Sequence, residues 1–404
     1  MIKNGLSAFE GKKILLLQGP VGPFFSRLAR DLEEIGAQVY KVNFNGGDYV
    51  FYPKKAISYH SFAEDWPEFF DQLLLQNEIN LVLLFGDCRS QHRVAHEISR
   101  LRGVSVGVFE EGYIRPDFVT LENHGVNNNS LLPRDMNHYL EYELSDQAKV
   151  VEVGKTFGFA AMWAMLYYTA CTLMWPIYWR YQHHRSLNLL EGLYWVRSFW
   201  RKRHYKRVER NVLKDLSTQY HGHYFIVPLQ VHNDAQIYFH SQFISVRDFI
   251  RKVMRSFSQH ADNQKHLVIK HHPLDRGYHD YTKYIAKLAR LNGLEGRVHY
   301  IHDQHLPSLF NSACGVVVVN STVGFSALHH GLPVKVCGQA LYDLQGLTFQ
   351  GTLDQFWQEA STHQVDQKLH NNFRHYLIDH TQLNGSFYKR LDIKGSHTGI
   401  IWKN

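Results

Sequence analysis

The stretch KKILLLQGPVGPFFSRLARDLEEIG, residues 12–36, decides the fold class. It opens with an apolar run, turns through two glycines and two prolines, and continues with apolar residues at helical spacing. Further apolar runs at 37–44, 80–87 and 103–112 are separated from one another by helix-like segments. Strands that alternate with helices of about 10–15 residues predict a parallel sheet covered by helices on both faces.

The second half of the chain repeats this pattern. Strand-like runs occur at 223–230, 266–273, 298–302, 315–322 and 332–338, with amphipathic segments between them. The sequence therefore predicts an α/β protein built from two doubly wound halves. The predicted domains are an N-terminal Rossmann-like domain over 1–150, an aromatic and basic helical segment over 151–215, a C-terminal Rossmann-like domain over 216–375 and a tail over 376–404 that packs back.

The composition indicates a globular protein in a reducing compartment. The chain has 404 residues, of which 44% are hydrophobic and 20% charged, so it can form a sizeable core and is neither disordered nor collagen-like. Its four cysteines form no CxxC pair, which argues against a zinc ribbon, a thioredoxin-type site and a disulfide scaffold. The first apolar run is too short for a signal peptide, so we expect a cytoplasmic protein.

The middle of the chain has a different character. Residues 157–179 carry no charged side chain, and this stretch has the length of a membrane span, yet it contains Pro176 and aromatic residues throughout. Residues 194–214 interleave aromatic residues with arginines and lysines. The pattern favours helices lying on an anionic membrane surface, with a buried helical pair and a true span as the alternatives. Despite the net charge of +7, no nucleic-acid-binding motif occurs, and we expect no nucleic-acid partner.

Polar residues follow the strands of the first half, where open α/β sheets bind their ligands. Gly19 lies in a turn that either admits a ligand close to the backbone or is a plain tight turn. Arg89 suits an anionic oxygen, with a local ion pair to Asp87 as the alternative. The adjacent carboxylates Glu110 and Glu111 point to opposite faces of a strand, so at most one is expected to enter a cleft as general acid or base, and capping of the next turn is the alternative.

Two polar clusters of the second half follow strands in the same way. Gln230 ends the strand-like run at 223–230 and Asp234 follows it. Asp234 suits a nucleophile or a charge stabiliser, with a plain Asx-turn as the alternative. Asn320, Ser321 and Thr322 precede a helix, whose first turn suits an anion, with ordinary capping as the alternative.

A third cluster contains residues that can carry positive charge. Lys270 and His272 lie at the end of the strand-like run at 266–273, Arg276 follows it, and Pro273 fixes the turn between them. These side chains suit a phosphate. Adjacent histidines rarely bind one ion together, so we expect no metal at His271 and His272.

Six motifs occur in a fixed order along residues 12–345: QGPVGPFF, FGDCR, FEEGYIRPDFVTLE, the Gln230–Asp234 loop, KHHPLDRG and NSTVGFSALHHGLPV. In this order they resemble the capsule polysaccharide synthesis and export family of the KpsS and LipB type in Gram-negative bacteria. The resemblance implies a GT-B-like β-Kdo glycosyltransferase with two facing Rossmann-type domains. It further implies that CMP-Kdo is the donor and that the enzyme begins the poly-Kdo linker on a phosphatidylglycerol-type lipid at the cytoplasmic face of the inner membrane.

The resemblance also suggests roles for residues. It implies that His272-Pro273 and Ser321-Thr322 bind the CMP portion of the donor. We extend the donor-binding group to Gln230, Lys270, Arg276 and Asn320, and we assign the acceptor to Gly19, Asp87, Arg89 and Arg115.

The implied mechanism needs two carboxylates. A β-linked product from a β-linked donor means net retention, so Asp234 is expected to attack or stabilise the anomeric centre. Glu111 is expected to handle the acceptor proton, and Glu110 can exchange roles with it. Protein groups can neutralise the single phosphate of CMP, so we expect neither a cofactor nor a metal requirement.

Three alternatives stay open. The chain could extend the linker rather than start it, act as a non-catalytic part of the capsule export complex, or be a nucleotide-sugar epimerase, although it lacks the dinucleotide fingerprint that an epimerase usually carries. In the favoured case, the extending Kdo transferase and the capsule export complex are the expected protein partners.

Overall fold

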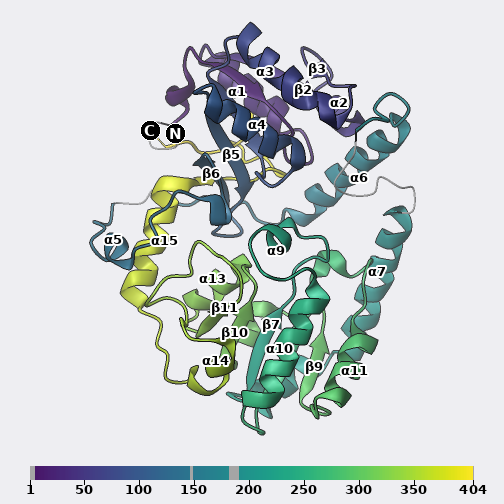
Figure 1. Cartoon of the computed structure of the whole chain (residues 1–404), viewed down its shortest axis with the longest axis vertical. Coiled ribbons are helices and arrows are strands. Elements are labelled where there is room, and N and C mark those ends of the chain that lie inside the picture. The colour runs from purple at the N-terminus through teal and green to yellow at the C-terminus, as the bar shows by residue number, and fades with distance from the viewer. Residues whose placement is uncertain (1–4, 146–148, 182–190, 404) are drawn as a thin grey trace. The chain divides into compact units, whose positions relative to one another are not determined.

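The computed structural model describes residues 5–145, 149–181 and 191–403, which fold into two compact units (Figure 1). Unit 1 contains residues 1–132, 143–189 and 374–404, and unit 2 contains residues 133–142 and 190–373.

Unit 1 is built on a seven-stranded sheet with the order β12-β6-β5-β4-β1-β2-β3. The first five strands along the chain pair in parallel, in the order 3-2-1-4-5 that is typical of a Rossmann-like fold, and the last two pair antiparallel at one edge. The strands are β1 (Lys13–Leu16), β2 (Gln38–Asn43), β3 (Ile57–Ser58), β4 (Leu81–Phe85), β5 (Ser105–Glu111), β6 (Phe118–Asn123) and β12 (Gln382–Asn384).

Helices cover both faces of this sheet, because successive strand residues are apolar on both sides. Leu28 and Leu32 of α1 pack on one face with Ile14, while Phe70 and Leu73 of α3 pack on the other. The helices of unit 1 are η2 (Leu6–Phe9), α1 (Phe24–Glu34), α2 (Gly46–Phe51), η3 (Ala63–Asp65), α3 (Trp66–Gln76), α4 (Ser90–Leu101), η4 (Asn127–Asn129) and α6 (Phe157–Leu173).

Unit 2 has a five-stranded, fully parallel sheet with the order β11-β10-β7-β8-β9. Counted from its own first strand, this is again the order 3-2-1-4-5. The strands are β7 (Tyr224–Pro228), β8 (His266–Lys270), β9 (Val298–Ile301), β10 (Gly315–Val318) and β11 (Val334–Val336).

The main core of unit 2 lies between this sheet and α10, α11 and α14, where Phe249, Phe257 and Trp357 are buried together. The last helix, α15, begins in unit 2 and ends in unit 1. The helices are α5 (Met136–Leu140), α7 (Glu191–Val208), α8 (Val212–Thr218), α9 (Ala235–Phe239), α10 (Val246–His260), η5 (Pro273–Asp275), α11 (Thr282–Leu291), α12 (Leu306–Phe310), α13 (Thr322–His329), α14 (Leu353–Glu359) and α15 (Gln367–Thr381).

The α/β class and the pair of Rossmann-like units that a GT-B-like architecture requires are confirmed. The boundaries of the two units differ from the predicted domains. The segment predicted as one helical insertion over 151–215 is divided, because α6 packs on α2 of unit 1 whereas α7 belongs to unit 2. The tail predicted over 376–404 supplies β12, which pairs with β6 in the sheet of unit 1.

Two glycines of α2 allow α6 to lie very close. A Cβ atom on Gly46 would stand 2.4 Å from the carbonyl oxygen of Ala170, and one on Gly47 would stand 2.4 Å from the ring of Tyr167. Tyr167, Ala170 and Cys171 are buried by this contact. None of the helices in the described part of the chain is long and apolar enough to span a membrane.

Replacing Gly46 with alanine is expected to lower the free energy of unfolding by about 1–3 kcal/mol, because the backbone oxygen of Ala170 cannot move aside easily. Urea denaturation followed by circular dichroism measures the change. The matched control is Gly158→Ala in α6, where the added Cβ meets open space and alanine favours the helix. Equal destabilisation by the two substitutions would contradict the packing argument.

Candidate functional site

Each sheet has a switch point, where the strand order reverses between its first and fourth parallel strands. These are β1 and β4 in unit 1, and β7 and β10 in unit 2. Open α/β sheets bind ligands outside the carboxyl ends of the strands at this point. Both switch points are bridged by polar side chains: Arg89 Nη1 donates to Gln18 Oε1 at 2.7 Å, and Gln230 Nε2 donates to Asn320 Oδ1 at 3.1 Å. Gln230 and Asn320 were both predicted to bind the donor. They are 90 residues apart in the sequence, and the structure brings them into direct contact.

Asp234 lies beside this bridge in unit 2. Its Oδ2 accepts a hydrogen bond from Gln230 Nε2 at 2.9 Å, and its Oδ1 caps α9 by accepting from the N–H of Gln236 at 2.9 Å. The Oε1 atom of Gln230 is buried and accepts no hydrogen bond from the described part of the chain. The capping interaction is thus present, and the catalytic role of Asp234 stays a prediction.

Ser321 and Thr322 form the start of α13, on the other side of the bridge. Ser321 is the N-cap, and its hydroxyl accepts a hydrogen bond from the N–H of Val323 at 3.3 Å. The hydroxyl of Tyr342 donates to the Ser321 carbonyl oxygen, which fixes the entry to the helix. The capping alternative is therefore realised, and both residues still lie at the carboxyl end of β10, where a donor phosphate is expected.

The two cations predicted near the carboxyl end of β8, Lys270 and Arg276, differ in their surroundings. Burial lowers the pKa of Lys270, and the charges of Asp303 and Glu209 partly offset this effect. Arg276 is buried, forms an ion pair with Asp303 and donates from Nε to the carbonyl oxygen of Ser198 at 3.1 Å. Its guanidinium thus ties α7 to the sheet, and this arrangement leaves Lys270 as the better placed of the two cations for a phosphate.

His272 and Pro273 form the turn that follows β8. Pro273 is the first residue of η5, where its missing N–H costs no hydrogen bond. The Nδ1 atom of His272 accepts a hydrogen bond from the N–H of Leu274 at 3.2 Å. The predicted pair therefore has a fixed backbone geometry at the carboxyl end of β8.

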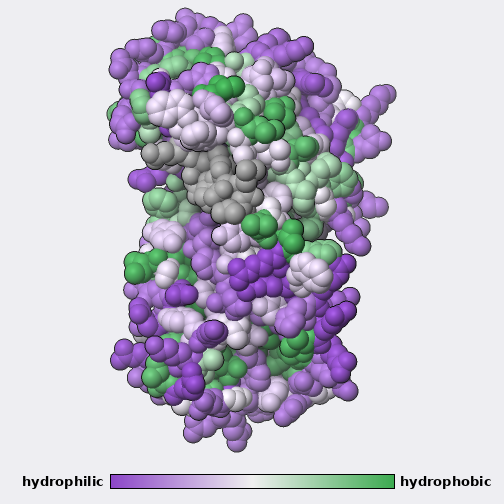
Figure 2. Space-filling view, turned by 90° about the vertical axis from the view of Figure 1, so that its right-hand side faces the viewer, coloured by the Kyte–Doolittle hydropathy of each residue, from purple (hydrophilic) through white to green (hydrophobic). Residues whose placement is uncertain are grey.

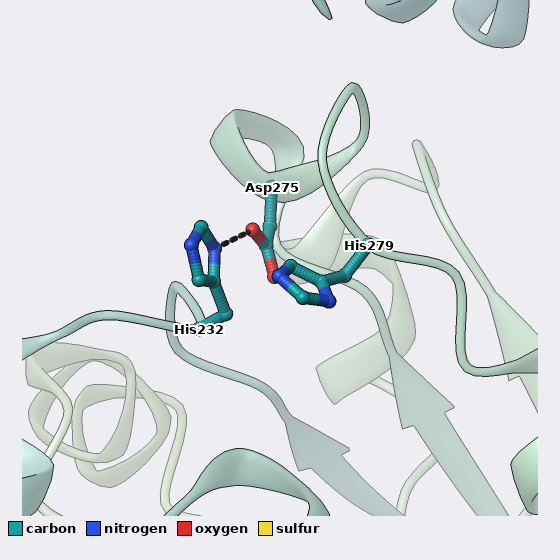
Figure 3. A group of neighbouring side chains, drawn as sticks. All are labelled: His232, Asp275 and His279. Carbon is teal, nitrogen blue, oxygen red and sulfur yellow. Dashed lines mark hydrogen bonds and ion pairs between the residues drawn. The ribbon is translucent and has the colours of Figure 1, made fainter. Parts of the chain in front are cut away.

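The sequence analysis assigned no role to three neighbouring residues in these loops: His232, Asp275 and His279 (Figure 3). His232 Nδ1 lies 2.5 Å from Asp275 Oδ1. Burial, followed by the charge of His232, lowers the pKa of His279. Next to them, burial and then the charge of His302 lower the pKa of His271 to about 4. The spacing of four residues between Asp275 and His279 was the only signal in the sequence.

In unit 1, the two strand-end glutamates diverge as the strand geometry predicts. Glu110 Oε1 accepts from the N–H of Glu111 at 2.9 Å, whereas Glu111 Oε1 accepts from the hydroxyl of Tyr388 at 2.6 Å. Burial raises the pKa of Glu110 to about 7, and the charge of Glu111 adds to this effect. Arg115 follows the strand and donates to the carbonyl oxygen of Gly112 at 3.1 Å. Glu110 is thus the carboxyl suited to proton transfer near neutral pH.

Asp87 holds a neighbouring loop. Its Oδ2 accepts hydrogen bonds from the N–H of Val126 and from Asn129 Nδ2, both at 3.0 Å. The ion pair considered between Asp87 and Arg89 is replaced by the contact of Arg89 with Gln18 across the switch point. Asp87 therefore holds the loop that contains η4, and Arg89 lies at the switch point of the sheet.

A small hollow of about 20 Å³ lies beside the glycine turn that contains Gly19. Lys41 and Asp48 line it, and the hydroxyl of Tyr167 lies 3.2 Å from Asp48 Oδ1. Burial lowers the pKa of Lys41 to about 8, and Asp48 partly offsets this effect. The sequence analysis missed both residues, because Lys41 lies within a predicted buried strand.

Comparison with solved structures gives only weak likenesses. A glycosyltransferase from Rickettsia africae is 10% identical, with a TM-score of 0.38 over 90% of this chain and 94% of that chain. Alr3699/HepE from Anabaena, solved with UDP-glucose, is 12% identical, with a TM-score of 0.35 over 89% and 92% of the two chains. Neither likeness is close enough to carry an argument about fold or activity.

Comparison of sequences is decisive for the family. The capsule polysaccharide export protein KpsS of Escherichia coli is 42% identical over 94% of this chain and 97% of its own length. The capsule polysaccharide modification protein LipB of Neisseria meningitidis serogroup A is 39% identical over 98% and 97% of the two lengths. The model of the family described as "Capsule polysaccharide biosynthesis protein" matches residues 80–388. This chain therefore belongs to the capsule polysaccharide biosynthesis protein family.

Proposed function

We propose that this chain is a glycosyltransferase that moves β-Kdo from CMP-Kdo to a phosphatidylglycerol-type lipid and so starts the poly-Kdo linker of a capsule. The observation that carries the proposal is the pair of Rossmann-like units, each with a polar bridge at its switch point, in a member of a capsule biosynthesis family. A purely structural export component would have no need of polar clusters at both switch points.

The two units have different tasks in this proposal. Unit 2 binds the donor, because Lys270, His272 and the start of α13 at Ser321 lie at the carboxyl ends of its strands. Unit 1 binds the acceptor, with Arg89 beside Gln18 at its switch point. The extending Kdo transferase and the capsule export complex are the proposed protein partners.

Transfer from CMP-Kdo generated in the reaction mixture to a fluorescent phosphatidylglycerol analogue, followed by mass spectrometry, tests the function. One added Kdo supports the priming reaction. A ladder of Kdo residues would instead indicate the linker-extending enzyme. No product from folded, lipid-bound protein would favour the non-catalytic export component.

Replacing His272 with alanine is expected to weaken CMP binding at least about tenfold, because the proposed hydrogen bond between the imidazole and the nucleotide is lost. Titration calorimetry with CMP measures the change. His272→Asn serves as the matched variant, because asparagine can also accept a hydrogen bond from the N–H of Leu274 and so keeps the turn. Full CMP affinity in the asparagine variant would assign His272 to the turn alone.

Membrane association belongs to the same proposal, because a lipid acceptor must be reached at a bilayer. The segment 157–179 leaves large apolar side chains exposed in unit 1, and Figure 2 shows hydrophobic residues gathered on the side that carries α6. We propose that this surface lies on the cytoplasmic face of the inner membrane. Its exposed members are Phe157, Phe159, Met162, Met165, Leu166, Leu173, Trp175, Ile177 and Trp179.

Replacing Phe157 and Leu173 together with serine is expected to weaken binding to phosphatidylglycerol vesicles at least about tenfold, because each side chain loses more than about 1 kcal/mol of burial in lipid. Phe157 is 66% exposed and Leu173 is 75% exposed, so the fold should be retained. Vesicle cosedimentation measures binding, and CMP affinity should be unchanged. The control is Leu101→Ser, a 70% exposed leucine of α4 outside this surface. Loss of vesicle binding in the control alone would refute the assignment.

A further inference from the structure

Three side chains at the carboxyl ends of β7 and β8 form a compact cluster in unit 2: His232, Asp275 and His279 (Figure 3). One potential ligand atom from each residue lies within 4.8 Å of the others. Asp275 is fully buried, and the two histidines are partly buried. Two imidazole nitrogens and one carboxylate oxygen are a donor set typical of transition-metal sites.

The backbone brings these residues together by itself. β7 and β8 are adjacent parallel strands, so the loops that follow them emerge side by side. After β8, the N–H of Asp275 donates to the carbonyl oxygen of His272 at 3.0 Å, and the N–H of His279 donates to that of Asp275 at 3.1 Å. Residues four apart on such a turn project to the same side. The cluster is therefore arranged in advance, and ligand binding requires little reordering.

One carboxylate oxygen of Asp275 accepts no hydrogen bond from the described residues. Its Oδ1 accepts from His232 Nδ1 at 2.5 Å, while its Oδ2 is buried without a hydrogen-bond partner among the residues described. Leaving such an atom unpaired costs about 1–3 kcal/mol. The rings of His232 and His279 have centroids 4.2 Å apart, and Figure 3 shows both beside the same carboxylate. A cation between the three groups would satisfy the unpaired oxygen.

We propose that His232, Asp275 and His279 bind a divalent transition-metal ion, with Zn²⁺ as the best match. The two nitrogen donors favour such an ion over Mg²⁺ and Ca²⁺, which prefer oxygen ligands alone. Three protein ligands leave a coordination position for water or for an anionic oxygen.

This site goes beyond the proposed transfer reaction and does not depend on it. Apart from the spacing of Asp275 and His279, no sequence pattern predicts this site, because His232 and Asp275 are 43 residues apart and belong to no metal-binding motif. The Nδ1 atom of the neighbouring His272 accepts a hydrogen bond from the N–H of Leu274, and His272 is not part of this cluster.

Cobalt titration of the full-length protein, freed of metal with a chelator, tests the proposal. Co²⁺ bound by nitrogen and oxygen ligands absorbs in the visible range, and we expect bands that saturate at one ion per chain and vanish when Zn²⁺ displaces the cobalt. His279→Ala and His232→Ala are each expected to weaken Co²⁺ binding at least about tenfold, because a ligand is lost. Thermal unfolding without metal shows whether each variant is folded, and either variant alone suffices for the test.

The matched control is His397→Ala in a second cluster, formed by Asp31, Glu34 and His397 in unit 1. There the Asp31 oxygens already accept hydrogen bonds from the backbone of His397 and from Thr398, so no position is left for an ion. Cobalt bands that persist in folded His279→Ala and His232→Ala, or that are lost in His397→Ala, would overturn the assignment. Failure of wild-type protein to bind Co²⁺ stoichiometrically would overturn it as well.

Discussion

Asp234→Asn is expected to reduce Kdo transfer by about 10³-fold or more, because an amide cannot act as a nucleophile or stabilise positive charge at the anomeric centre. The substitution is conservative for the fold. Asparagine caps a helix as well as aspartate does, so the hydrogen bond from the N–H of Gln236 that starts α9 should survive. The affinity for CMP should change far less than the rate of transfer.

The matched control for this variant is Asp135→Asn. Asp135 is also a helix N-cap in unit 2, and its Oδ1 accepts from the N–H of Asn137 at 3.0 Å. The two substitutions therefore change the same chemical group in the same local structure. Single-turnover transfer rates of both variants separate the two roles of Asp234. Activity of Asp234→Asn equal to that of Asp135→Asn would leave Asp234 with the capping role alone.

Glu110→Gln is expected to reduce transfer by about 10²–10⁴-fold, the usual contribution of a general acid or base. The pKa of Glu110 is raised to about 7, chiefly by burial, so a base at this position becomes active as the pH rises through about 7. In wild type, kcat/KM should therefore rise with pH around pH 7. This rise, the acidic limb of the pH profile, should be absent in the glutamine variant. Glu111→Gln is the neighbouring control, because Glu111 is engaged by Tyr388. Loss of the limb in Glu111→Gln alone would reverse the assignment.

The same substitution has a predicted effect on stability. The folded-state pKa of Glu110 lies above its usual value of 4.5, so its protonated form stabilises the fold at low pH, and this contribution is lost as the pH rises to about 7. Glutamine resembles the protonated form at every pH. The variant should therefore gain stability relative to wild type between pH 5 and pH 8, by up to about 3 kcal/mol. Thermal unfolding of both proteins at the two pH values measures the difference.

Local sequence was sufficient for the elements and for the positions of polar residues along them. The predicted strand around Tyr224–Pro228 is strand β7, and Gln230 and Asp234 follow it as expected. The reason is that strand and helix periodicity, and the turns between them, depend on neighbouring residues only. The divergence of Glu110 and Glu111 was predictable on the same ground, since successive side chains on a strand point to opposite faces.

The environment of each side chain was not predictable in this way. Nothing near Arg276 in the sequence shows that Asp303 and the carbonyl oxygen of Ser198 engage it. Nor does local sequence reveal that burial raises the pKa of Glu110. Burial and pairing depend on residues that are distant along the chain, and no local pattern encodes them.

By itself, the sequence determined two α/β halves with parallel strands, the strand ends at which their polar residues lie, and the resemblance to a capsule family. The sequence predicted a tail that packs back, but only the tertiary structure showed that it adds a strand to unit 1, where Gln382 pairs with Thr120. Only the tertiary structure placed Tyr167 of the aromatic segment against Asp48, and His232 against Asp275. Periodicity is a short-range property of the chain, whereas these contacts join residues between 43 and 262 positions apart, and they form only when the whole unit folds.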